Sequence, residues 1–187
     1  ATSSVTLWGL LASETKQPPD GSEPVEWLLL TNHEIRTRAE AELVLFGYTQ
    51  RWRVEQFHKT WKSVCKVEKT QLRDISHIER WATILASVAM RLLRLTYFAR
   101  SSPNLPATVE LSKLEITALI VEKGRGTHKL GDMISIGLAT RWIAELGGYV
   151  GPKSSGGPPG TIVLARGARK LADRTEAIGK VLEFTAQ

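Results

Sequence analysis

The stretch YTQRWRVEQFHKTWK, Tyr48 to Lys62, places cations, aromatic rings and a single acid on one predicted helix. On a helical wheel its polar residues form one stripe: Tyr48, Arg51, Glu55, Lys59 and Lys62, with His58 beside it. The opposite side consists of Val54, Phe57, Trp61 and Val64. The pattern predicts a helix that packs on its apolar face and displays cations, a phenol and one carboxylate on the other.

Two interpretations of Glu55 follow from this stripe. Cations and a phenol are suitable donors for phosphate oxygens, but a carboxylate among them repels phosphate unless a cation lies between the two. Mg²⁺ meets that requirement, because it binds few protein carboxylates and takes further oxygen ligands from substrate phosphates. The alternative is an i, i+4 ion pair between Glu55 and Lys59, worth roughly 0.3–0.5 kcal/mol on a solvated helix. The residues alone favour the ion pair.

Length and composition limit the class of protein. A chain of 187 residues with 42 % hydrophobic residues can bury a core. The formal net charge of +6 favours a polyanionic partner, nucleic acid first. The single cysteine, Cys65, excludes an internal disulfide and fits a reducing cytoplasm. No apolar run reaches the length of a membrane span, so we expect no membrane partner.

The first part of the chain is predicted to be a β-hairpin. Two short apolar runs, at 4–12 and 25–31, flank a segment rich in turn-forming residues. An isolated hairpin is marginal in water, so we expect this one to belong to a larger sheet. Because the chain opens in a predicted strand with no signal peptide, we expect it to be a fragment of a longer protein.

Helical patterns follow the hairpin. Three of them begin with Ser/Thr-x-x-Glu, at Thr37, Ser76 and Ser112, in which the hydroxyl and the carboxylate each satisfy a free backbone N–H group. The first helix weakens at Gly47, so the stretch after it either continues that helix or begins another. The expected helices are 37–45, 48–67, 76–98, 112–124, 134–146 and 161–182, with loops at 124–131 and 151–160.

Two of these helices carry apolar stripes that predict the core. In helix 76–98 the stripe consists of Ile78, Trp81, Ala82, Leu85, Val88, Ala89, Leu92 and Leu93. In helix 134–146 the inward residues are expected to be Leu138, Ala139, Trp142 and Ile143, and Gly147 is expected to end the helix.

The spacing Tyr48-x2-Arg51-x3-Glu55-x6-Lys62 resembles the Y-R-E-K signature of bacterial cut-and-paste DDE transposases of the insertion-sequence-4 family. The similarity extends along nearly the whole chain in the same order. Beyond the signature it includes the stretches VEWLLLTN, IERWATILASVAMRLLRL, LSKLE, IAELGGYVGPK and PPGTIVLARGARKL.

The resemblance implies a ribonuclease-H-like catalytic core and two-metal chemistry with Mg²⁺, for which Mn²⁺ substitutes. Glu55 corresponds to the last acid of the DDE triad and is implied to be both catalytic and a metal ligand. Trp27 corresponds to a tryptophan that stacks on a base flipped out of the duplex, where an aromatic face offsets lost base stacking. The implied DNA-binding residues are Tyr48, Arg51, Lys62 and Trp27, with Trp52, Lys59 and His58 as further candidates.

The chain departs from the family pattern upstream of Glu55. The two aspartates of the triad are expected on core strands before the motif, but Asp20 alone precedes it, and it lies in a turn-like segment. In the stretch 161–168, Thr161, Ala165 and Ala168 stand where family members tend to carry tryptophans; small residues there would weaken a dimer contact or allow closer approach of helices.

We therefore expect an α+β fragment that is mostly α. Residues 1–100 would form the C-terminal part of a ribonuclease-H-like catalytic domain, with the end of a β insertion in the hairpin 4–31 and the Glu-bearing helix within 37–98. Residues 101–187 would form a helical C-terminal domain that mediates dimerisation. With one of three acids present, this chain by itself is expected to be catalytically inactive.

Two functional hypotheses compete. In the first, the chain is part of a bacterial cytoplasmic DNA transposase that cleaves DNA, forms a DNA hairpin and transfers strands. Its partners would be the inverted-repeat ends of the transposon and a second protomer in a synaptic complex. In the second, the chain is a truncated, inactive module that binds DNA or transposase and inhibits transposition. The presence or absence of the upstream aspartates separates the two.

Overall fold

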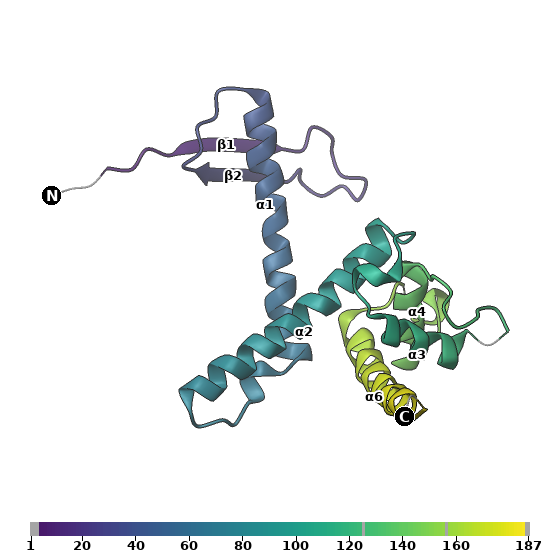
Figure 1. Ribbon diagram of the computed structural model, residues 1–187. Coiled ribbons are helices and arrows are strands. Elements are labelled where there is room, and N and C mark those ends of the chain that lie inside the picture. Colours follow the sequence, from purple (N-terminus) through teal and green to yellow (C-terminus); the bar gives the residue numbers. More distant parts are fainter. Residues whose placement is uncertain (1–3, 125, 156, 186–187) are drawn as a thin grey trace. The chain divides into compact units, whose positions relative to one another are not determined.

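The computed structural model describes residues 4–124, 126–155 and 157–185. The chain divides into two compact units, Ala1–Glu55 and Gln56–Gln187, which we describe separately. The expectation of a mostly helical α+β chain is confirmed, because helices dominate the described residues and one two-stranded sheet accompanies them (Figure 1). The predicted division near residue 100 falls at the end of a long helix and stays a prediction about function.

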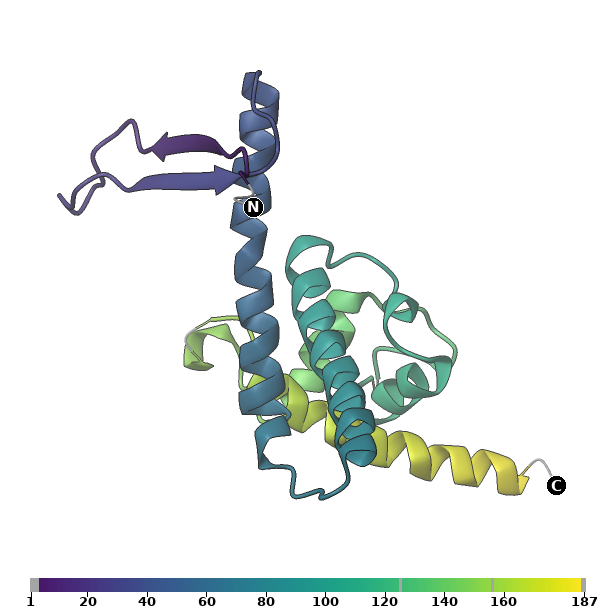
Figure 2. The ribbon, with the colours of Figure 1, turned by 90° about the vertical axis from the view of Figure 1, so that its left-hand side faces the viewer.

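The first unit contains the expected hairpin. Strands β1 (Trp8–Ser13) and β2 (Glu26–Thr31) pair antiparallel, with Trp8 opposite Thr31 and Ser13 opposite Glu26. The loop is closed at its base by Glu14, whose backbone N–H donates to the carbonyl of Val25 at 3.1 Å. The hairpin lies beside the N-terminal part of helix α1 (Figure 2), and Leu29 is its one buried large apolar side chain among the described residues.

Helix α1 (Arg38–Lys59) begins at the predicted capping box. The Glu40 amide donates to the Thr37 hydroxyl at 3.3 Å, and the Thr37 amide donates to the Glu40 carboxylate at 2.8 Å. Gly47 does not interrupt the helix, so the stretch beginning at Tyr48 continues it. The α-helix ends at Lys59, earlier than the end expected at Val67. A π-helical turn, η1 (Thr60–Val64), and a 3₁₀ turn, η2 (Val67–Lys69), follow it.

The second predicted capping box, at Ser76, is wrong: helix α2 (Ile75–Ser101) has a different N-cap. Its N-cap is Asp74, whose carboxylate accepts hydrogen bonds from the amides of Ser76 at 2.8 Å and His77 at 3.1 Å. The pattern Ser76-x-x-Glu79 is therefore inside the helix and caps nothing. Asp is at least as good an N-cap as Ser, and its position two residues earlier lets it satisfy the first free N–H groups.

The third capping box is confirmed. Helix α3 (Lys113–Lys123) has Ser112 as N-cap, with reciprocal bonds between Ser112 and Glu115. A 3₁₀ turn, η3 (Ala107–Val109), precedes it, and α4 (Ile136–Leu146) follows with Ser135 as N-cap and Gly147 at its C-terminal end, as expected. The expected loop 151–160 contains one helical turn, α5 (Pro152–Ser155), before α6 (Thr161–Thr185). Residues 125 and 156 of the two expected loops lie outside the described part.

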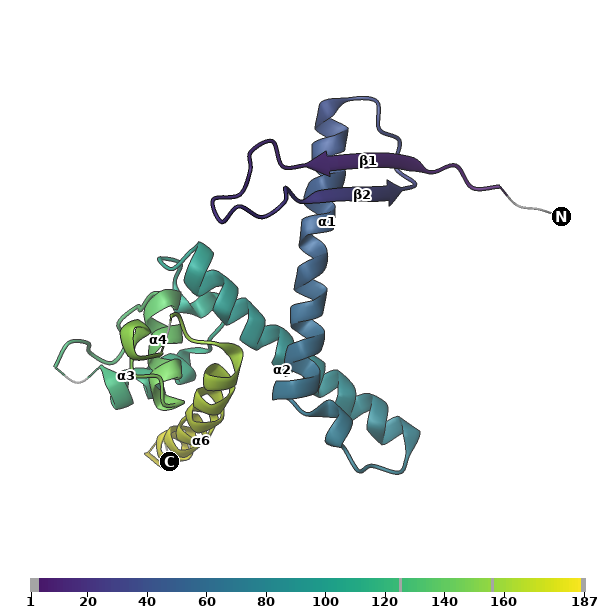
Figure 3. The ribbon, with the colours of Figure 1, turned by 180° about the vertical axis from the view of Figure 1, so that it is seen from behind.

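The core of the second unit forms where α3, α4 and α6 meet the C-terminal half of α2 (Figure 3). Helices α4 and α6 approach closely at two glycines, because a Cβ atom on Gly167 would overlap the Ile143 carbonyl oxygen and one on Gly147 would overlap that of Val163. The predicted inward residues Ala139, Trp142 and Ile143 are buried. Small residues in this part of α6 thus allow close helix packing within the chain.

The apolar stripe predicted along α2 is core at its C-terminal end only. Ala89 and Leu92 are buried, but Ile78, Trp81 and Val88 are 36 %, 43 % and 45 % exposed. By length and composition α2 also passes for a membrane-spanning helix, as some helices of soluble cores do. Its Leu92 and Leu95 belong to the helical core, but most of its apolar stretch is exposed within the described residues.

Candidate nucleic-acid interface

The fold of the first unit brings Trp27 beside Tyr48. Trp27 lies on β2 and Tyr48 on α1, and their ring centroids are 5.3 Å apart with the planes at 61°, an edge-to-face contact. The two side chains are 42 % and 39 % exposed. Two of the candidate DNA-binding aromatics thus share one surface, although 20 residues separate them in the chain.

Arg51 and Glu55 extend this surface along α1. The guanidinium carbon of Arg51 lies 5.7 Å from the Tyr48 ring centroid, within range of a cation–π contact. Nη1 of the same arginine lies 3.2 Å from Oε1 of Glu55. The result is a continuous row of four side chains, Trp27, Tyr48, Arg51 and Glu55, which we call the Trp27–Glu55 row. Three of its members are one helical turn apart, as the sequence predicted.

The ion pair of Glu55 is with Arg51, rather than with Lys59 as the ordinary interpretation expected. The two side chains are 60 % and 49 % exposed, and an ion pair so exposed to water contributes only about 0.2–1 kcal/mol. Such a pair is readily exchanged. A phosphate approaching the row would therefore meet a guanidinium that is positioned but only weakly held.

The remaining signature residue, Lys62, lies in the π-helical turn η1 of the second unit. Its Nζ is 2.9 Å from Oε1 of Glu68. The neighbouring Trp61 is anchored, because its indole N–H donates to the Ala82 carbonyl at 3.1 Å. π-Helical turns recur at functional sites because they shift the direction of the side chains that follow.

The further candidates differ in their surroundings. The His58 ring contacts Phe57 edge-on, with centroids 5.6 Å apart, and is thus part of an aromatic group as well as exposed. Trp52 is 66 % exposed, and within the described residues neither it nor Lys59 has a hydrogen-bond, ion-pair or ring partner. Of the face expected to be packed, Val54 is 53 % exposed, whereas Phe57, Trp61 and Val64 are half-buried.

The residues present do not by themselves form a magnesium site. Across residues 4–124, 126–155 and 157–185, no group of three or more His, Cys, Asp or Glu side chains is arranged to hold a metal. Glu55 is the one carboxylate of the Trp27–Glu55 row, and a guanidinium occupies it. Mg²⁺ is usually held by one or two protein carboxylates together with water and substrate phosphates, so Glu55 could supply one of its ligands.

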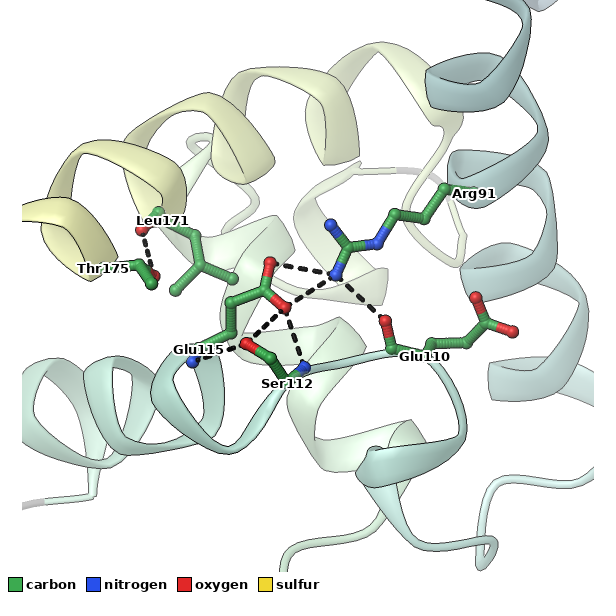
Figure 4. A network of polar contacts seen from close by, with 6 residues as sticks. All are labelled: Arg91, Glu110, Ser112, Glu115, Leu171 and Thr175. Carbon is green, nitrogen blue, oxygen red and sulfur yellow. Dashed lines mark hydrogen bonds and ion pairs between the residues drawn. The ribbon is translucent and has the colours of Figure 1, made fainter. Parts of the chain in front are cut away.

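Two contacts of acidic residues were missed from the sequence: that of Glu68, and that of the capping-box residue Glu115 with Arg91. Glu68 pairs with Lys62, and no helical or strand period links two residues that far apart across a turn. Glu115 accepts from Nη2 of Arg91 at 2.9 and 2.8 Å and from the Ser112 amide at 2.8 Å (Figure 4). Figure 4 also shows the same Arg91 nitrogen reaching the Glu110 carbonyl, so this contact joins α2 to the start of α3.

Glu115 carries an altered pKa as a consequence. Partial burial by itself raises the pKa of this carboxyl, but the hydrogen bonds from Arg91 and Ser112 and the charge of Arg91 together hold its pKa below the ordinary value. The ionised form is thereby favoured near neutral pH. This group stabilises the helical unit by joining α2 to the start of α3.

Residues 23–91 match the family model of the transposase DDE domain. The matched segment begins before β2, contains α1, η1 and η2, and ends within α2. It therefore includes all eight predicted site residues. The match supports assignment of this segment to a DDE transposase, a class of protein that binds DNA and rearranges it by phosphoryl transfer.

Proposed function

We propose that the chain is the C-terminal portion of a cut-and-paste transposase of the insertion-sequence-4 family, and that the Trp27–Glu55 row contacts DNA. The observation that carries this proposal is the row itself. A base-stacking candidate from a strand and three signature residues from a helix meet on one exposed surface. An ordinary solvated helix face would not require Trp27 to lie there.

In this proposal Tyr48 and Arg51 hold backbone phosphates of the transposon end. The hydroxyl and the guanidinium both donate hydrogen bonds, and the guanidinium suits two oxygens of one phosphate. Lys62 adds a point charge, and Trp52, Lys59 and His58 are further candidate DNA contacts. Trp27 offers a ring to a flipped base. Since Trp27 already contacts Tyr48, base stacking and phosphate binding would be coupled through that ring pair.

Glu55 is proposed as one carboxylate of a divalent-metal site, with Mg²⁺ or Mn²⁺ bound when further acids are supplied. Those acids would come from outside the described residues, on the strands of a ribonuclease-H-like core. The complete enzyme would then cleave DNA, form a hairpin and transfer strands. It would act as a homodimer on paired inverted-repeat ends in the bacterial cytoplasm, with residues 101–187 at the dimer contact.

A second candidate function is inhibition of transposition by an inactive DNA- or transposase-binding module. It is favoured by one observation: the described residues form an exposed row of side chains suited to phosphate, but no group of three or more acids, histidines or cysteines able to bind a metal. Such a module would bind transposon ends without cutting them. Metal-dependent cleavage by the chain itself would exclude this candidate.

The deciding experiment replaces Glu55 by Gln in a transposase that contains this chain. We expect Mg²⁺-dependent nicking of the transposon end to be lost while DNA binding is retained, because the lost group is a metal ligand. The matched control is Glu42→Gln, since Glu42 forms the same kind of exposed i, i+4 ion pair with Arg38 on the same helix. If the Glu55→Gln variant nicked DNA as fast as the Glu42→Gln variant, Glu55 would be a surface ion-pair partner and no metal ligand.

A further inference from the structure

In the two turns that follow α1, the side chain of Lys62 lies against the carboxylate of Glu68. Nζ of Lys62 lies 2.9 Å from Oε1 of Glu68, and the two side chains are 51 % and 64 % exposed. Lys62 belongs to η1 and Glu68 to η2, so two successive turns meet through this pair. Both partners are open to solvent, and a phosphate can reach the ammonium group from outside.

The backbone of the loop explains why Glu68 returns to Lys62. The π-helical turn ends with the Cys65 amide donating to the Thr60 carbonyl at 3.0 Å. Lys66 then takes a left-handed conformation, with φ of 57°, and is the one non-glycine with positive φ among the described residues. A left-handed residue costs an L-amino acid roughly 1–2 kcal/mol, so the surrounding contacts impose this reversal.

The turn is also fixed to the helical unit. Thr60 at its start is buried, and the Trp61 indole is hydrogen-bonded to the Ala82 carbonyl on α2. After the reversal, the Lys69 amide donates to the Lys66 carbonyl at 2.9 Å and closes η2. Lys62 and Glu68 therefore extend from two anchored turns rather than from a free loop.

We infer that Glu68 is a positioning residue that holds the Lys62 ammonium group in place and competes with DNA phosphate for it. The inference rests on the proposed role of Lys62 as a phosphate contact. When DNA binds, the ammonium group exchanges a carboxylate oxygen for a phosphate oxygen, and the Glu68 charge remains nearby as a repulsive neighbour. Glu68 thereby weakens phosphate binding at Lys62, and only a phosphate that lies close enough to displace the carboxylate forms the contact.

Removing the negative charge of Glu68 should consequently strengthen DNA binding. An exposed ion pair is a weak competitor, so we expect Glu68→Gln to lower the Kd by about twofold to fivefold. Because the released ammonium group becomes available to neutralise one phosphate, the plot of log K against log[salt] should steepen by up to about 0.9. A purely structural role of Glu68 would weaken binding or leave the salt slope unchanged.

The measurement is fluorescence anisotropy of a short labelled DNA duplex with the 187-residue chain at several salt concentrations. Glu79→Gln is the matched control, since Glu79 is an exposed acid near the start of α2 and has no ion-pair partner among the described residues. It produces the same change in net charge. Equal strengthening by Glu79→Gln and Glu68→Gln would mean a general charge effect and would overturn the inference.

A double-mutant cycle with Lys62→Gln separates this inference from the function on which it rests. If Glu68 acts through Lys62, the effect of Glu68→Gln should vanish in the Lys62→Gln background; its persistence there would refute the competition. If Lys62→Gln alone leaves DNA affinity and salt slope unchanged, the proposed phosphate contact itself fails. Circular dichroism of each variant confirms that the helical fold is kept.

Discussion

The two units of this chain are stabilised in different ways. The second unit surrounds a core of buried side chains, most of them from α2, α3, α4 and α6. In the first unit, Leu29 is the buried large apolar residue of the described part, while Leu28, Leu30 and Leu43 are 69 %, 68 % and 68 % exposed. The predicted site residues on β2 and the first half of α1 belong to the poorly buried unit.

The contrast shows that site geometry here depends on secondary structure more than on a core. One helix and a two-stranded hairpin bury too little apolar area to be stable alone. The spacing of Tyr48, Arg51 and Glu55 nevertheless follows from α1 itself, because residues three and four apart share a helix face. The position of Trp27 depends on the hairpin keeping its contact with α1, which makes it the most vulnerable member of the row.

The largest expected difference between the units concerns buried side chains. Ile143→Ala removes a fully buried side chain from α4 and should lower the free energy of unfolding by about 2–5 kcal/mol. Leu30→Ala, on the exposed face of the hairpin, should change it by less than about 0.5 kcal/mol. Urea unfolding followed by circular dichroism measures both. Equal losses would mean that the hairpin face is covered in solution.

Close packing of α4 on α6 gives the next largest effect. Gly167→Ala places a methyl group against the Ile143 carbonyl and should destabilise the second unit by about 1–3 kcal/mol. Gly179→Ala is the control on the same helix, because its Cβ would lie 3.4 Å from a Leu114 methyl carbon, an ordinary contact. That change should be neutral or stabilising, since Ala favours helices over Gly. Thermal unfolding measures this difference, and the Tm of Gly167→Ala should be clearly lower than that of Gly179→Ala.

The smallest effect compares the ion pairs of the two units. Glu115→Gln should destabilise the protein by about 1–2 kcal/mol near neutral pH, because its hydrogen bonds to Arg91 involve charge. Glu55→Gln, whose pair with Arg51 is exposed, should cost less than about 0.5 kcal/mol.

The pH dependence of these variants follows from the sign of the pKa shift. The pKa of Glu115 is lower in the folded state than its ordinary value of 4.5. Its stabilisation is therefore fully present above that value and is lost as pH falls through the folded pKa. The difference in free energy of unfolding between the wild type and Glu115→Gln should become smaller in that acidic range. A gap that stays constant below pH 4.5 would contradict the assigned cause.

The sequence determined the features that depend on neighbouring residues. The capping boxes at Thr37 and Ser112, the continuity of the helix through Arg51 and Glu55, and the hairpin follow from hydrogen bonds and side-chain periods that span a few residues. The N-cap of α2 was predicted wrongly, because Asp74 takes the place assigned to Ser76. The match of residues 23–91 to the transposase DDE domain is a property of the sequence as well.

Tertiary structure alone decided the contacts that cross between elements. Trp27 meets Tyr48 because a strand packs beside a helix, and Lys62 meets Glu68 because a left-handed residue reverses the loop. The exposure of Trp81 on α2 could not be predicted either. Helical spacing identifies an apolar face but does not show whether another element covers it. Such contacts depend on packing and on loop conformation over many residues, which local spacing does not specify.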